Sequence, residues 1–154
     1  MPIMRQQSRP LKFSALIVFT ALATFSLALG MQQEKPTARS VWRGVYTDEQ
    51  AKRGESLYRL RCASCHGDKL TGGESAPPLA GGQFLSTWNG LTLDVLFDRI
   101  RISMPSDNPA RVGRVAKADI LAYILSMNRF PAGRTELQYK SELLKEILFQ
   151  AYRP

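Results

Sequence analysis

Cys62-Ala63-Ser64-Cys65-His66 contains both cysteines and the only histidine of this 154-residue chain. The spacing is that of the C-x-x-C-H pattern of haem attachment. Two thiols about one helical turn apart can reach the two vinyl groups on one side of a porphyrin, and the adjacent histidine then lies beneath the iron. The stretch therefore predicts one covalently bound haem c, attached through Cys62 and Cys65, with His66 as an iron ligand.

Other uses of these three residues fit the sequence less well. A structural zinc site needs four protein ligands, and the chain has no further cysteine or histidine. A thioredoxin-like redox pair lies near a strand-helix unit, and no strand pattern precedes Cys62. A plain disulfide would leave His66 at the next position unexplained.

An iron bound by one histidine has a second face, and methionine sulfur is a natural ligand for it. The candidates are Met31, Met104 and Met127. Met31 lies at a possible cleavage point, and Met127 lies on the apolar stripe of a predicted helix, where core packing is expected. Met104 lies directly before Pro105 at the start of a loop, so we expect Met104 to bind the iron. Such ligation raises the reduction potential and closes the iron to small ligands.

The first thirty residues have the character of an export signal. Three basic residues precede an uncharged stretch at 13–29, and Ala28 and Gly30 form a small-x-small pair before Met31. Residues 1–30 are therefore interpreted as a cleaved signal peptide or as a retained membrane anchor. Both interpretations place the rest of the chain outside the cytoplasm, where covalent haem attachment takes place in bacteria.

The composition is that of a globular protein. Hydrophobic residues make up 44% and charged residues 22% of the chain, which excludes wholesale disorder and a multi-span membrane protein. The formal net charge is +8, but no basic run with interleaved aromatic residues is present, so nucleic-acid binding is not expected. The positive charge favours an acidic partner surface or an anionic membrane.

The remaining sequence predicts a small helical domain. Apolar residues at helical spacing predict helices from Thr47 into Cys62, from Thr92 to Met104, over 116–127 and from Ser141 to Ala151. Thr47 is expected to cap its helix, with Gln50 completing a capping box. Polar residues 31–41 indicate a linker, and glycine and proline indicate loops over 67–90 and 105–113.

These patterns resemble the class I c-type cytochromes of the single-haem bacterial kind, over about residues 42–138. Among them are the cytochrome c domains associated with cbb3 oxidases and alcohol dehydrogenases. In that family a first helix carries a glycine, an aromatic residue four positions later and the first haem cysteine after four more. Gly54, Tyr58 and Cys62 match this spacing.

The resemblance implies an all-α, cytochrome c-like fold of three or four core helices around the haem, followed by a C-terminal amphipathic helix. The last core helix of the family carries an aliphatic residue and an aromatic residue three positions on, which Ile120 and Tyr123 match. The first and last core helices are then expected to cross at Gly54.

The resemblance also implies contacts around the haem. The family's P-x-L step corresponds to Pro77-Pro78-Leu79, in which the Pro77 carbonyl accepts the Nδ1–H of the haem histidine and fixes its ring. Trp88 is interpreted either as a donor to a haem propionate or as a core residue. The other expected pocket residues are Leu79, Phe84, Leu96 and Ile100, while Arg99 and Arg101 lie near a propionate or on a solvated helix face.

Together these features predict a one-electron carrier rather than an enzyme, acting in the bacterial periplasm with respiratory complexes or a periplasmic dehydrogenase as partners. Two alternatives stay open. The chain could be a haem-bearing subunit of a larger oxidoreductase that docks through residues 139–154, beyond the cytochrome c domain at 42–138. It could also be a ligand-binding or peroxidase-like haem protein with a displaceable Met104, although no second histidine exists to assist peroxide chemistry.

Overall fold

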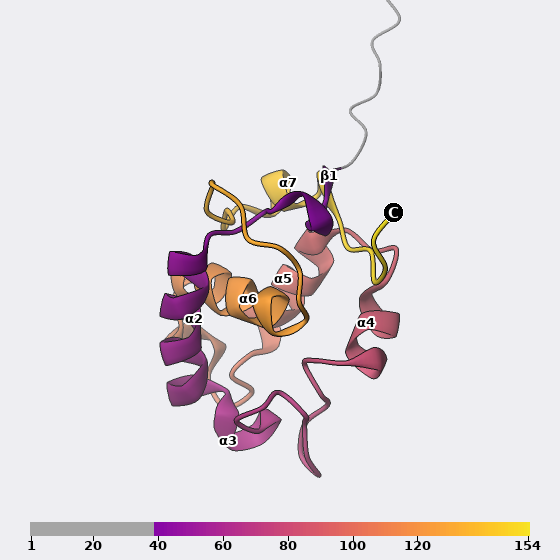
Figure 1. Ribbon diagram of the computed structural model, residues 1–154. Coiled ribbons are helices and arrows are strands. Elements are labelled where there is room, and N and C mark those ends of the chain that lie inside the picture. Colours follow the sequence, from indigo (N-terminus) through magenta and orange to yellow (C-terminus); the bar gives the residue numbers. More distant parts are fainter. Residues whose placement is uncertain (1–38) are drawn as a thin grey trace, which may run out of the picture. The chain divides into compact units, whose positions relative to one another are not determined.

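The computed structural model describes residues 39–154 (Figure 1). Its elements are β1 (Arg39–Ser40), η1 (Val41–Arg43), α2 (Asp48–Arg61), α3 (Ala63–His66), α4 (Gly82–Trp88), α5 (Leu93–Ser103), η2 (Pro109–Arg111), α6 (Arg114–Met127), α7 (Ser141–Leu144) and β2 (Ile147–Leu148). This part of the chain is mostly helical, which confirms the predicted all-α class. The expected export segment 1–30, Met31 and most of the linker 31–41 lie outside the described residues.

The helices α2 and α6 form the central pair, and Figure 1 shows α6 lying across α2. Gly54 of α2 lies against the backbone of α6, because a Cβ built on Gly54 would overlap the carbonyl oxygen of Asp119. Beside this contact the rings of Tyr58 and Tyr123 pack with their centroids 5.4 Å apart. The helices therefore approach most closely where the resemblance implies a crossing, and the missing side chain of Gly54 permits it.

Replacing Gly54 with alanine is expected to destabilise the fold by about 3 kcal/mol, because the added methyl group meets backbone atoms that cannot rotate away. Gly82→Ala is the matched control, since a Cβ at Gly82 meets nothing within 4 Å. Urea unfolding followed by circular dichroism compares the two variants. Equal stability of the two variants would contradict a close helix contact at Gly54.

The start of α2 agrees with the sequence in part. The Thr47 hydroxyl accepts a hydrogen bond from the Gln50 N–H at 3.1 Å, as a helix cap should. The expected capping box is only half formed, because the Gln50 side chain turns into the core, where it is 2% exposed. There its amide nitrogen donates to the Leu137 carbonyl at 3.0 Å, and its oxygen accepts from the Leu137 N–H at 2.7 Å. The helix ends at Arg61, and Cys62 follows directly.

The helices α5 and α6 follow the predicted ones closely. Thr92 precedes α5, and Met104 leaves it with an extended backbone, as a residue before proline prefers. The helix α6 begins two residues earlier than the predicted range 116–127. The expected core role of Met127 is wrong, because its side chain is 40% exposed. Met127 ends α6, beyond the buried run at 117–125.

The expected loop over 67–90 contains one short helix, α4. Phe84 and Trp88 lie four residues apart on α4, with ring centroids 6.3 Å apart, and Phe84 is buried. No side chain caps the helix at Gly81. The helix α4 is stabilised by the packing of one face and not by a local cap. The glycine-rich sequence around it therefore does not predict a helix.

The C-terminal segment forms one short helix and a two-residue strand, so the predicted amphipathic helix from Ser141 to Ala151 is wrong beyond its first turn. The helix α7 ends at Leu144, and β2 then pairs in parallel with β1. Ile147, Phe149 and Ala151 are buried, which is the alternation of a strand. The buried side chains of the C-terminal segment therefore pack into the same core as the helices.

The folded part also begins before the expected boundary at residue 42. Arg39 and Ser40 form β1, and Val41 is fully buried. The linker expected over 31–41 therefore does not include its last three residues. Arg39 and Ser40 pair with β2, which lies more than a hundred residues later in the sequence, and Val41 packs into the core.

Replacing Phe149 with alanine is expected to cost about 3–5 kcal/mol, because its buried ring packs edge-on against the rings of Phe84 and Phe130. Tyr152→Ala is the control, since Tyr152 is 82% exposed and should change stability little. Chemical unfolding of both variants measures the difference. A stable Phe149→Ala variant would show that the tail does not belong to the core.

Candidate functional site

One cavity of about 760 Å³ brings together the residues predicted for the site. Its volume lies within the range of about 300–1,000 Å³ that is usual for ligand and cofactor pockets. The turn of α3, the loop after it, α4, α5 and α6 all contribute to its walls. All ten predicted site residues line this cavity: Cys62, Cys65, His66, Pro77, Leu79, Phe84, Trp88, Leu96, Ile100 and Met104.

The two cysteines lie at either end of one helical turn, where α2 gives way to α3. The backbone N–H groups of Cys65 and His66 both donate to the carbonyl oxygen of Cys62, at 3.2 and 3.0 Å. Both thiols are free, and Cys65 is exposed. Burial raises the pKa of the Cys62 thiol to about 11, with a further contribution from Cys65 that Lys117 partly opposes. Cys62 is therefore a neutral thiol at pH 7.

The imidazole of His66 is held by the loop that follows it. His66 is 6% exposed, and its Nδ1 lies 2.8 Å from the carbonyl oxygen of Pro77. With its proton on Nδ1, the ring donates to Pro77 and keeps Nε2 available for a metal ion. The resemblance implies this contact between the haem histidine and the carbonyl of Pro77.

Hydrogen bonds from other segments hold the loop that carries Pro77. The N–H of Leu79 donates to the carbonyl of Leu70 at 2.8 Å. Asn128, directly after α6, donates to the carbonyl of Leu79 at 2.9 Å and accepts from the N–H of Gly81 at 3.1 Å. Asn128 is not among the residues predicted from the sequence, where its place at the end of a predicted helix is the one signal that points to it.

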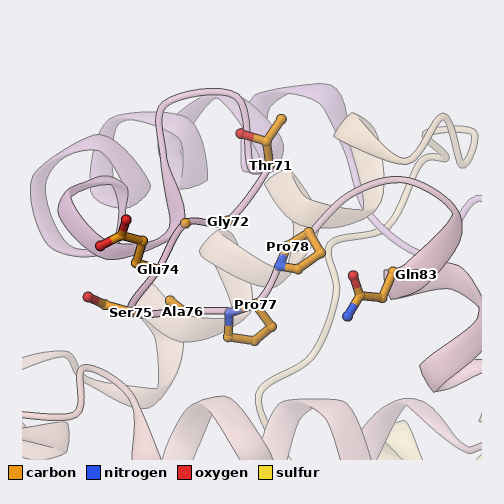
Figure 2. Close-up of a pocket in the computed structure, with 9 residues that line it drawn as sticks. Thr71, Gly72, Glu74, Ser75, Ala76, Pro77, Pro78 and Gln83 are labelled. Atoms are coloured by element: carbon orange, nitrogen blue, oxygen red, sulfur yellow. The ribbon is translucent and has the colours of Figure 1, made fainter.

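The same loop borders a second, more open depression of about 590 Å³, shown in Figure 2. Gly72 in this loop has a φ of +73°, and a Cβ there would lie 2.6 Å from the nitrogen of Pro78. Only glycine fits this turn without a shift of the backbone. Residues 75–78 of the loop and Gln83 of α4 line both the depression and the main cavity, so the loop and the start of α4 lie between the two.

Met104 enters the main cavity from the end of α5. Its N–H donates to the Ile100 carbonyl at 3.1 Å, and its side chain is partly buried. The cavity lining includes Met104 but not Met127. Among the methionines at 39–154, the structure therefore places Met104 with His66 and the cysteines.

The two arginines considered for propionate contact differ in position. Arg99 lines the cavity, as does Arg111, which pairs with Asp107 at 2.9 Å. Arg101 is not among the lining residues and pairs with Asp98 on its own helix at 2.8 Å. The hydrogen bond from Arg101 lowers the pKa of the Asp98 carboxyl. Arg99 is therefore the arginine of this pair that a group in the cavity could contact.

The helix α6 contributes two lining residues that were not predicted for the site from the sequence. Ile120 and Ile124 lie one helical turn apart and both line the cavity. Their spacing of four residues is the signal that could have shown that both face the same space.

The donor set fits a haem of the c type. Two free thiols, an imidazole with Nδ1 engaged and a thioether line one cavity, and most of its other walls are apolar. Together with the helix crossing at Gly54, this fold and this site define a class I c-type cytochrome, a haem protein of electron transport. Residues 49–124 match the family model described as cytochrome c oxidase, cbb3-type, subunit III, which confirms that the chain contains a cytochrome c domain.

Two other comparisons complete the findings. The crystal structure of the sulfane dehydrogenase SoxCD from Paracoccus pantotrophus is similar at 20% sequence identity and a TM-score of 0.47. That match covers 95% of this chain and 67% of the other. No curated protein gives a significant match.

Proposed function

We propose that this chain is a single-haem cytochrome that carries one electron at a time between redox proteins in the bacterial periplasm. Cys62 and Cys65 form the covalent links, and His66 and Met104 are the two iron ligands. The haem iron, when bound, supplies reversible one-electron chemistry. The observation that supports the proposal most strongly is that both thiols, the imidazole and the thioether line one cavity.

The chain's own side chains would keep such a site rigid and dry. The carbonyl of Pro77 orients the ring of His66 and favours the tautomer with its proton on Nδ1. Leu96, Ile120 and Phe84 are almost fully buried in the cavity wall and exclude water. With both ligand positions filled and the walls fixed, little needs to move when an electron arrives or leaves.

The compartment follows from the export-type segment at 1–30 and from the place where haem is attached in bacteria. No helix within residues 39–154 is long and apolar enough to cross a membrane. Cleavage of the first thirty residues gives a free periplasmic carrier, and their retention gives one held at the periplasmic face of the inner membrane.

The edge of the cavity has the character of a transient docking surface. Leu60 is 68% exposed at the cavity, beside Arg61, and Arg99 is also exposed there. An exposed apolar side chain near positive charges suits brief contact with an acidic partner. Respiratory complexes and periplasmic dehydrogenases are the partners we propose.

Steering by these charges predicts a salt dependence of the electron-transfer rate. Oxidation of the reduced protein by ferricyanide, an anion, should slow as NaCl rises, because salt screens the attraction. Oxidation by a cationic cobalt complex should not slow. Stopped-flow measurements with the two oxidants give the comparison, and the same salt response for both would contradict electrostatic steering at this edge.

One alternative is a subunit of a larger oxidoreductase that docks through residues 139–154. The amphipathic helix that suggested it does not continue beyond Leu144. Leu144, Ile147 and Phe149 are buried in the chain's own domain, and the large apolar side chains that the tail exposes are those of Tyr139, Leu143 and Tyr152. The peroxidase-like alternative depends on an easily displaced Met104, which ligand binding to the reduced protein can test.

The proposal is tested on the full chain expressed in a host that attaches haem. Membrane and soluble fractions are compared by a haem-stained denaturing gel and by intact mass. We expect a haem signal that survives denaturation and a mass increased by one haem, and the mass also reports whether residues 1–30 are removed. A mature mass equal to the amino acids alone would refute haem attachment and with it the carrier function.

A further inference from the structure

The segment 104–108 connects α5 to η2 and begins with Met104. Behind it lies Lys117 of α6, a charged side chain that is only 2% exposed. The ammonium nitrogen Nζ donates to the carbonyl of Arg101 at 2.9 Å and to the carbonyl of Pro109 at 2.8 Å. These two carbonyls precede and follow the segment, so one side chain joins both of its ends.

Each of these hydrogen bonds satisfies a group that needs a partner. The carbonyl of Arg101 lies in the last turn of α5, where backbone carbonyls have no partner within the helix. A cation is also favoured at a helix C-terminus. For Lys117 itself, a buried ammonium is costly unless it is hydrogen-bonded, and burial accordingly lowers its pKa.

Lys117 is not among the residues that line the cavity, so it is placed to act through the segment and not through direct contact with a haem. A short segment with both ends held has few conformations, whereas release of its ends opens many. We propose that Lys117 is a positioning residue, which holds the segment 104–108 in place and thereby keeps Met104 bound to the iron. This inference rests on the proposed function, in which Met104 is the second iron ligand.

The test compares Lys117→Met with Gln50→Met in full-length ferric holoprotein. Each substitution removes a buried polar side chain that makes two hydrogen bonds to backbone, and each leaves an unbranched apolar side chain. The side chain of Gln50 bonds only to the backbone of Leu137, and neither Gln50 nor Lys117 lines the cavity. The control therefore matches the loss of buried hydrogen bonds without releasing the segment 104–108.

Two measurements separate local opening from loss of overall stability. Imidazole can bind ferric iron only when the methionine leaves, so its binding rate reports opening of the segment. Urea unfolding reports global stability. We expect imidazole to bind Lys117→Met at least about tenfold faster than the native protein, since the loss of one hydrogen bond to a charged group, about 1.5 kcal/mol, corresponds to about tenfold. Gln50→Met should lose stability without this acceleration.

Lys117→Gln serves as a second variant, because it keeps a donor and should accelerate imidazole binding less. Rates in both Lys117 variants no faster than in Gln50→Met would overturn the inference. So would failure of both Lys117 variants to fold where Gln50→Met folds, because Lys117 would then serve the whole fold. If the native ferric protein lacks the sulfur-to-iron absorption band, the proposed ligation by Met104 fails instead, and the two failures are thus distinguishable.

Discussion

A chain in which Cys62 and Cys65 are both replaced with serine is expected to carry no haem and to be largely unfolded. Without the haem, the mostly apolar walls of a cavity of about 760 Å³ lose the group against which they pack, and losing even one large core side chain costs about 2–5 kcal/mol. A typical domain has only about 5–15 kcal/mol of stability in total. The loop at 67–81 has no helix of its own after α3 and would lose the surface on which it packs.

Circular dichroism and thermal melting of the purified variant measure this effect. Ser64→Ala is the matched control, because it changes the same turn and keeps both thiols. We expect the control to bind haem and melt cooperatively, and the double variant to show little helix and no sharp transition. A native-like helical spectrum with a normal melt in the haem-free double variant would show that the polypeptide alone holds the cavity open.

The parts of this molecule that sequence reasoning could predict depend on local spacing. Five consecutive residues are enough to predict the roles of Cys62, Cys65 and His66. The role of Met104 is predicted from its place before a proline at the end of a helix. Gly54 is identified through the resemblance to class I c-type cytochromes, which carry a glycine at this distance before the first haem cysteine. For the two cysteines and the histidine, the chemistry of haem attachment requires these residue types at a fixed separation along the chain, so one sequence is enough.

The parts that could not be predicted depend on partners far away in the chain. The apolar residues of the tail fit a helix as well as a strand, and pairing with β1 decides between them. The helix α4 depends on contacts of Phe84 with the tail. Lys117 and Asn128 bond to carbonyls of other segments, and nothing in their neighbouring residues indicates those partners.

Replacing Met104 with alanine is expected to open the iron to carbon monoxide in the reduced protein. A thioether that occupies the position about 99% of the time weakens the apparent affinity of a competing ligand about a hundredfold, and its removal restores that factor. The reduction potential should fall as well, because methionine ligation raises it. Met104 is only partly buried, so its truncation should leave the fold intact.

Met127→Ala is the matched control, because Met127 is 40% exposed and does not line the cavity. Absorption titration with carbon monoxide and a potentiometric titration compare the two variants with the native protein. The control should resist carbon monoxide and keep the native potential. If the native protein binds carbon monoxide as tightly as Met104→Ala does, the iron has no firm second ligand. The ligand-binding alternative would then displace the electron carrier, because an iron position that exchanges freely suits capture of small molecules better than transfer of electrons with little movement.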